Sequence, residues 1–249
     1  MLSKIKHEAL ELKTLLRSIP FPIVTMFAVS VIMMNLLANK SISLPMDWLA
    51  LDCGIVVSWV SFLSMDIITK HFGPKAANEV SVVAVAFNLL CCGFFRLCGA
   101  IPGVWGESFV EGSETVINQA LDNTLSGTWY VLLGSTVAFI VSAVINNSIN
   151  YGIGRLFRLR ADGFAVYALR TYISTAIGQF CDNLVFALIV SHFFFGWTLL
   201  QCVTCSLTGM VVELLCEAVF SPIGFRICRK WKAEGVGKEY FALKGDGVK

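Results

Sequence analysis

Charged residues are scarce in this sequence. Only 14% of its 249 residues are Asp, Glu, Lys or Arg, whereas 56% are hydrophobic, and the mean hydropathy is +0.74. Because a soluble domain of ordinary composition carries about a quarter charged residues, this composition excludes that class. The net charge of +2 is also too small to indicate a nucleic-acid surface, so we expect no nucleic-acid partner.

The motifs of ATP-driven pumps and of membrane-embedded proteases are missing as well. The sequence has no GxxxxGK[ST] stretch, in which backbone amides and a lysine would hold phosphates. It has only three histidines, no HExxH, and no glycine-framed nucleophile with a partner histidine. Most of its nine cysteines lie in apolar stretches, where packing explains them better than redox or metal chemistry. We therefore expect neither an enzyme nor a cofactor.

Long apolar stretches make up most of the chain. A helix needs about 20 apolar residues to cross the hydrocarbon core, and six stretches come close to this length. They cover about 21–38, 46–67, 80–101, 127–151, 166–191 and 196–220. The sequence thus predicts an all-α, polytopic protein of the cell membrane with six transmembrane helices. We expect residues 1–20 to form an amphipathic segment, 21–220 the transmembrane domain and 221–249 a basic tail.

Most cations lie in alternate links and at the two ends, with Lys40 in the short first link as the exception among the links. Lys and Arg gather before residue 18, at 70–75, at 155–160 and after 225, whereas the 102–126 link has acids and no Lys or Arg. By the positive-inside rule, both termini are cytoplasmic. Residues 3–18 predict a surface helix ending at Pro20, not a cleaved signal peptide, and Gly73-Pro74 predicts the end of the second spanning helix.

Polar side chains recur at helical spacing inside the apolar stretches. Such groups are costly at membrane depth unless they face a bundle interior or a water-filled cavity, and residues i and i+4 share one helix face. The faces comprise Asn88, Cys92 and Arg96; Ser142, Asn146 and Asn150; Arg170, Ser174, Gly178 and Asp182, flanked by Gln179 and Asn183; and Ser206, Gly209, Glu213 and Glu217. Hydrogen bonding between helices for packing is the alternative, and it fits the serines better than the charged residues.

A cavity lined by carboxylates, amides and one cation suits a flat ligand with several hydrogen-bond donors and acceptors. A carboxylate can accept two parallel N–H bonds from a guanine-like edge, and Asn or Gln can meet its carbonyl and ring nitrogen. The expected binding residues are Asp182, Gln179, Asn183, Asn146, Asn150, Asn88 and Arg96. Glu213 or Glu217 would neutralise Arg96. An ion channel would instead show repeated rings of pore-lining groups or a pore motif.

Two segments of nine residues resemble each other. "SAVINNSIN" (142–150) and "STAIGQFCD" (174–182) share Ser, then Ile three residues on, an amide at the sixth place and Asn or Asp at the ninth. Internal repeats often build a central site in transporters. The similarity therefore favours pairing of the fourth and fifth helices.

Several motifs together resemble one family. "SFLSMDIITKHFGPKAAN", "VAFNLL", "GSTVAFIVSAVINNSIN" and "LRTYISTAIGQFCDNLVFALI" resemble the VUT family of six-helix queuosine precursor transporters, over about residues 35–220. This resemblance implies import of 7-cyano- or 7-aminomethyl-7-deazaguanine, and it marks out Asp66 as a cap on the cavity or a part of its inner gate. Family members generally have Glu in place of Lys70 and Ser in place of Asn183, which leaves the exact substrate open.

Other interpretations and partners stay open at this point. A vitamin-binding S component of an energy-coupling-factor transporter also has six helices, but "TMFAVSVIMMNLLA" lacks the AxxxA face of such subunits. A helical membrane scaffold would use the polar faces for packing alone. The expected partners are a small-molecule substrate and membrane lipid, with a homo-oligomer left open and an ATPase coupling module as the weaker alternative.

Overall fold

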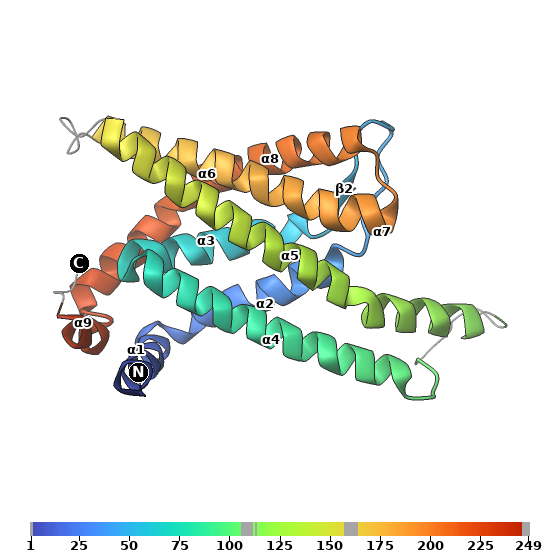
Figure 1. Ribbon diagram of the computed structural model, residues 1–249, viewed down its shortest axis with the longest axis horizontal. Helices are drawn as coiled ribbons and strands as arrows, with labels where there is room; N and C mark the ends of the chain where they lie inside the picture. Colours follow the sequence, from blue (N-terminus) through green and yellow to red (C-terminus); the bar gives the residue numbers. More distant parts are fainter. Residues whose placement is uncertain (1, 106–111, 113, 157–163, 246–249) are drawn as a thin grey trace. The chain divides into compact units, whose positions relative to one another are not determined.

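The computed structural model describes residues 2–105, 112, 114–156 and 164–245, and these residues are nearly all helical (Figure 1). The elements are α1 (Leu2–Ser18), α2 (Phe21–Leu37), β1 (Ser41–Ile42), β2 (Leu51–Asp52), α3 (Ile55–Phe72), α4 (Pro74–Ala100), α5 (Glu114–Leu156), α6 (Phe164–Phe186), the π-helix η2 (Ala187–His192), α7 (Phe193–Phe195), α8 (Leu199–Glu234) and α9 (Lys238–Lys244). The predicted all-α fold is confirmed.

Several of these helices can cross a membrane. Five helical segments in the described part of the chain are long and apolar enough, namely Ile55–Phe72, Pro74–Ala100, Thr115–Ser142, Thr175–Phe195 and Leu199–Phe220. A sixth candidate is the bent pair of α1 and α2, which meet at 103°, and α2 carries most of the apolar residues of this pair. The polytopic architecture predicted from the sequence is therefore confirmed.

The second spanning helix begins later than expected. We expected a helix from about residue 46, but residues 41–52 form a short hairpin in which β1 pairs antiparallel with β2, and α3 starts at Ile55. The Asp52 carboxylate accepts a hydrogen bond from the Gly54 N–H at 2.7 Å. An Asp side chain that binds the backbone two residues on favours a turn over a helix, so the helix cannot begin before this turn.

Two other helices extend beyond their expected ends. Residues from Glu114 onward, which we expected in an acidic loop, form the first turns of the 43-residue helix α5. At a rise of about 1.5 Å per residue, α5 exceeds the roughly 30 Å core of a bilayer, so part of it lies outside the core. Helix α8 likewise continues past residue 220 and through Pro222 to Glu234, because a membrane helix tolerates an internal proline.

The chain forms two compact units. Unit 1 comprises Met1–Met33, Val57–Asn88 and Cys216–Lys249, and unit 2 comprises Met34–Val56 and Leu89–Leu215. Each unit has its own apolar core.

Unit 1 contains the predicted Gly-Pro turn. Helix α3 ends at Phe72, Gly73 has a positive φ of 92°, and Pro74 is the first residue of α4. Glycine adopts this left-handed conformation without strain, and proline suits the first turn of a helix because its missing N–H would have no partner there. The predicted end of the second spanning helix is thus confirmed, although it falls at residue 72 and not 67.

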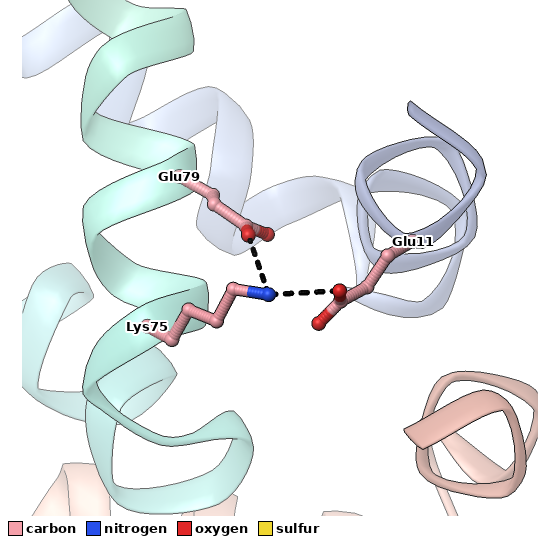
Figure 2. A network of polar contacts seen from close by, with 3 residues as sticks. All are labelled: Glu11, Lys75 and Glu79. Atoms are coloured by element: carbon pink, nitrogen blue, oxygen red, sulfur yellow. Dashed lines mark hydrogen bonds and ion pairs between the residues drawn. The ribbon is translucent and has the colours of Figure 1, made fainter. Parts of the chain in front are cut away.

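The two ends of the chain meet at this turn. The Lys75 ammonium contacts Glu11 of α1 at 2.8 Å and Glu79 at 3.5 Å (Figure 2), and His71 Nε2 lies 3.0 Å from the carbonyl oxygen of Val236, just before α9. Helices α1 and α9 also contact each other (Figure 1). Both ends of the described chain therefore lie at the same end of unit 1.

The contacts of Lys75 predict a specific loss of stability. Glu11 is 5% exposed, so Lys75→Ala would leave a buried carboxylate without its cation. Because Lys75 itself is half exposed, we expect a loss of about 1–2 kcal/mol, measured as a melting temperature about 3–6 °C lower in nanodiscs.

A matched control separates this contact from loss of a surface charge. Lys230 also lies four residues before a glutamate, but both side chains of that pair are exposed and 3.8 Å apart, so Lys230→Ala should leave the melting temperature almost unchanged. Equal losses in the two variants would contradict the role given to Lys75.

Candidate functional site

Helix α6 carries three of the expected binding residues. Gln179, Asp182 and Asn183 lie near its end, and α5 packs along α6 in unit 2 (Figure 1). The predicted pairing of the fourth and fifth helices is confirmed by this packing. Ser142 of α5 is hydrogen-bonded to the carboxyl group of Asp182 on α6, an interhelical contact of the kind that the packing interpretation predicts for this serine.

Helix α8 contributes the second acid of this group. Asn183 donates a hydrogen bond from Nδ2 to Glu213 Oε2 at 3.2 Å, and Glu213 is 4% exposed. One turn earlier, a Cβ at Gly209 would lie 2.7 Å from Asn183 Nδ2. The absence of a side chain at Gly209 therefore leaves room for Asn183 against α8.

Gln179 adds a buried acceptor without a partner. It is 7% exposed, and among the described residues its Oε1 atom has no hydrogen-bond partner. A buried amide oxygen of this kind costs free energy unless a ligand or a water satisfies it. We call Ser142, Gln179, Asp182, Asn183 and Glu213 the α5–α6–α8 polar cluster.

The polar cluster is suited to hydrogen bonding. Its two carboxylates and the free amide oxygen of Gln179 are acceptors, so it can bind a ligand that presents several N–H donors. Among the described residues, no group of three or more His, Cys, Asp and Glu side chains could hold a metal ion. The described acceptors of the cluster allow it to recognise a ligand by hydrogen bonds.

Asp52 of β2 contacts the α8 face that carries Glu213. This face comprises Cys202, Cys205, Gly209 and Glu213 at spacings of three and four residues, and Asp52 interacts with Cys205. Burial raises the pKa of Asp52 from its ordinary value of 3.8 to about 6, against backbone N–H groups that lower it. Asp52 is not among the residues that the sequence predicted for the site.

The remaining predicted residues are not joined to the polar cluster by any described contact. Arg96 is exposed on α4, and its pairing with Glu213 or Glu217 stays a prediction. Asn88 is 1% exposed, with its Nδ2 atom unpartnered among the described residues, and it belongs to unit 1. Asp66, Asn146, Asn150 and Glu217 lie on α3, α5 and α8, but their side chains fall outside the described residues.

Buried polar groups among spanning helices are typical of proteins that carry a polar solute across a membrane. The chain matches the family described as "Putative vitamin uptake transporter" over residues 52–227. Because the match covers more than half of its length, the chain belongs to this family, and the resemblance noted in the sequence is confirmed. No curated protein and no solved structure matches the chain. The protein is a multi-pass small-molecule transporter of the cell membrane.

The tight contact at Gly209 gives a steric prediction. Gly209→Ala would place a methyl group against Asn183 Nδ2, displace the amide from Glu213 and lower transport at least about 10-fold, the effect of losing about 1.4 kcal/mol of binding. Uptake of the transported solute into cells measures this, with membrane protein amount as the reference.

Gly93→Ala is the matched control, because a Cβ there meets nothing within 4 Å. It should transport as the unchanged protein does. Full transport by Gly209→Ala would show that the position of Asn183 does not matter for the site.

The raised pKa of Asp52 gives a prediction of pH dependence. A carboxyl group with a higher pKa in the folded state stabilises the fold when protonated, and this contribution is lost as pH rises through the folded pKa. Asp52→Asn keeps an oxygen for the Gly54 N–H but has no charge. The free energy of unfolding of Asp52→Asn, relative to that of the unchanged protein, should therefore rise by about 1–3 kcal/mol between about pH 4 and pH 7. Melting temperatures of the two proteins across this pH range measure the change.

Asp47→Asn provides the reference, since Asp47 is exposed in the same link. Its melting temperature relative to the unchanged protein should vary less with pH than that of Asp52→Asn. If the difference between Asp52→Asn and the unchanged protein did not vary with pH, burial of the Asp52 charge would be contradicted.

Proposed function

We propose that the chain imports a queuosine precursor, a 7-deazaguanine base that carries a cyano or an aminomethyl group. The observation that carries this proposal is the α5–α6–α8 polar cluster, which gathers two carboxylates and an unpartnered amide oxygen among apolar helices. A flat guanine-like ring presents the matching row of N–H donors. Family membership supports uptake of a small molecule, and the motifs quoted above favour this substrate class.

The described contacts suggest a role for four residues of the cluster. Asp182 accepts the two parallel N–H bonds of the guanine edge, because a carboxylate offers two oxygens in one plane. Gln179 accepts a further ring N–H at its free Oε1. Glu213 holds the Asn183 amide from the far side and so fixes its orientation toward the ligand.

Other residues complete the proposed site as predictions from the sequence. Asn146, Asn150, Asn88 and Arg96 would line the rest of the cavity, with Glu217 beside Glu213 as charge balance. Asp66 would cap the cavity or belong to its inner gate. Transport would follow alternating access around this polar core.

Rescue of queuosine synthesis tests the proposal. The chain is expressed in a strain that can neither make queuosine nor import its precursors, each precursor is fed at low concentration, and queuosine in tRNA is measured. We expect rescue by the unchanged protein and its loss in Asp182→Asn, because the amide replaces one acceptor oxygen by a donor. Asp47→Asn, which changes an exposed aspartate in the same way, should still rescue.

The outcomes separate the alternatives. No rescue by a well-inserted protein would contradict the proposed substrate, and full rescue by Asp182→Asn would contradict the role of the carboxylate. A vitamin-binding S component is the second candidate, because the family description names vitamin uptake. Co-purification with an ATPase module and transport that depends on it would favour that candidate. A scaffold would transport nothing in either assay.

A further inference from the structure

Helix α1 has a cationic stripe that no part of the described chain covers. Lys6, Leu10, Lys13 and Arg17 are all exposed, and their spacing of four, three and four residues places them on one helix face. Glu11 and Leu15, which are buried, lie on the opposite face. The stripe therefore points away from the part of unit 1 on which α1 packs.

The orientation of α1 follows from its angle with α2. The two helices meet at 103°, so if α2 crosses the bilayer, α1 runs along the membrane surface. The ion pair of Glu11 with Lys75 fixes α1 in this position (Figure 2), together with Leu15 in the apolar core of unit 1.

The depth of the stripe follows from the residues at the corner between the helices. Phe21, the first residue of α2, is 78% exposed, and its apolar ring suits the boundary between the hydrocarbon core and the headgroups of the inner leaflet. Arg17 lies in the last turn of α1, on the other side of the corner from Phe21. Leu10, which is 49% exposed between Lys6 and Lys13, can enter the same interface, as apolar residues of surface helices do.

We propose that the Lys6–Lys13–Arg17 stripe is a binding surface for the headgroups of anionic lipids in the inner leaflet. Each Lys or Arg near an anionic membrane surface contributes favourably to binding, and long basic side chains at a helix boundary reach the headgroups while their stems stay in apolar contact. Glu8, which is exposed as well, lies on the opposite side of α1 and does not interrupt the stripe. This inference does not depend on the transported substrate.

The melting temperature of the full-length protein in nanodiscs tests the proposal. Discs of phosphatidylcholine are compared with discs containing about 30% phosphatidylglycerol, which gives an anionic surface. We expect the unchanged protein to melt about 5 °C higher in the anionic discs, and this difference should shrink at high salt. In Lys6→Gln/Lys13→Gln/Arg17→Gln the difference should fall by more than half.

Two further triple variants serve as controls. Lys230→Gln/Lys232→Gln/Lys238→Gln removes the same charge from exposed positions on α8 and α9 and should keep the difference. Lys6→Arg/Lys13→Arg/Arg17→Lys preserves the charge of the stripe and should keep it too.

Four results would overturn the proposal. They are no stabilisation of the unchanged protein by phosphatidylglycerol, an unchanged difference in the neutralised stripe, equal losses in the two neutralised triples, and the same stabilisation by soluble glycerol phosphate. If the neutralised stripe instead released a co-purifying protein and left the lipid effect intact, the stripe would be a protein-docking surface and the lipid proposal would be wrong.

Discussion

A carboxylate buried among apolar helices needs a hydrogen-bond donor, and in this protein Asn183 supplies one to Glu213 across α6 and α8. Hydrogen bonds to charged groups contribute about 1.5–3 kcal/mol, and leaving such a group unsatisfied costs more. The bond requires the two helices to approach closely, which Gly209 allows. The positions of Asn183 and its neighbour Asp182, and with them the orientation of the polar cluster, depend on this contact.

In unit 1, the two chain ends pack against the turn that joins α3 and α4. The Gly73-Pro74 turn lies between the two chain ends, with Lys75 bound to α1 and His71 beside Val236. Aromatic side chains of α3, α8 and α9 pack around this turn, and Phe72 is stacked on Phe241. Three of the four cation-rich segments of the sequence therefore lie at one end of unit 1, as the positive-inside rule requires of segments on one side of a membrane.

The sequence predicted the features that depend on neighbouring residues along the chain, namely the spanning helices and one turn. Hydropathy over about 20 residues located the spanning helices, since the bilayer demands that length, and Gly73-Pro74 located a turn because each residue restricts φ in its own way. Helical spacing placed Gln179, Asp182 and Asn183 together near the end of α6. The surface helix before Pro20 was also predicted, although its ion pair with Lys75 was not.

Contacts between distant segments were beyond this reasoning. A hydropathy average across Leu49 to Ile55 masks Asp52, and it cannot show that this segment pairs with Ser41 and Ile42 in a hairpin. The role of Ser142 depends on the packing of α5 against α6, which helical spacing alone does not fix.

The central claim, that the polar cluster binds the imported base, is tested most directly by equilibrium binding of 7-aminomethyl-7-deazaguanine to purified protein and to Gln179→Leu. The account predicts saturable binding that weakens at least about 10-fold in the variant, and equal affinity of the two proteins would contradict it.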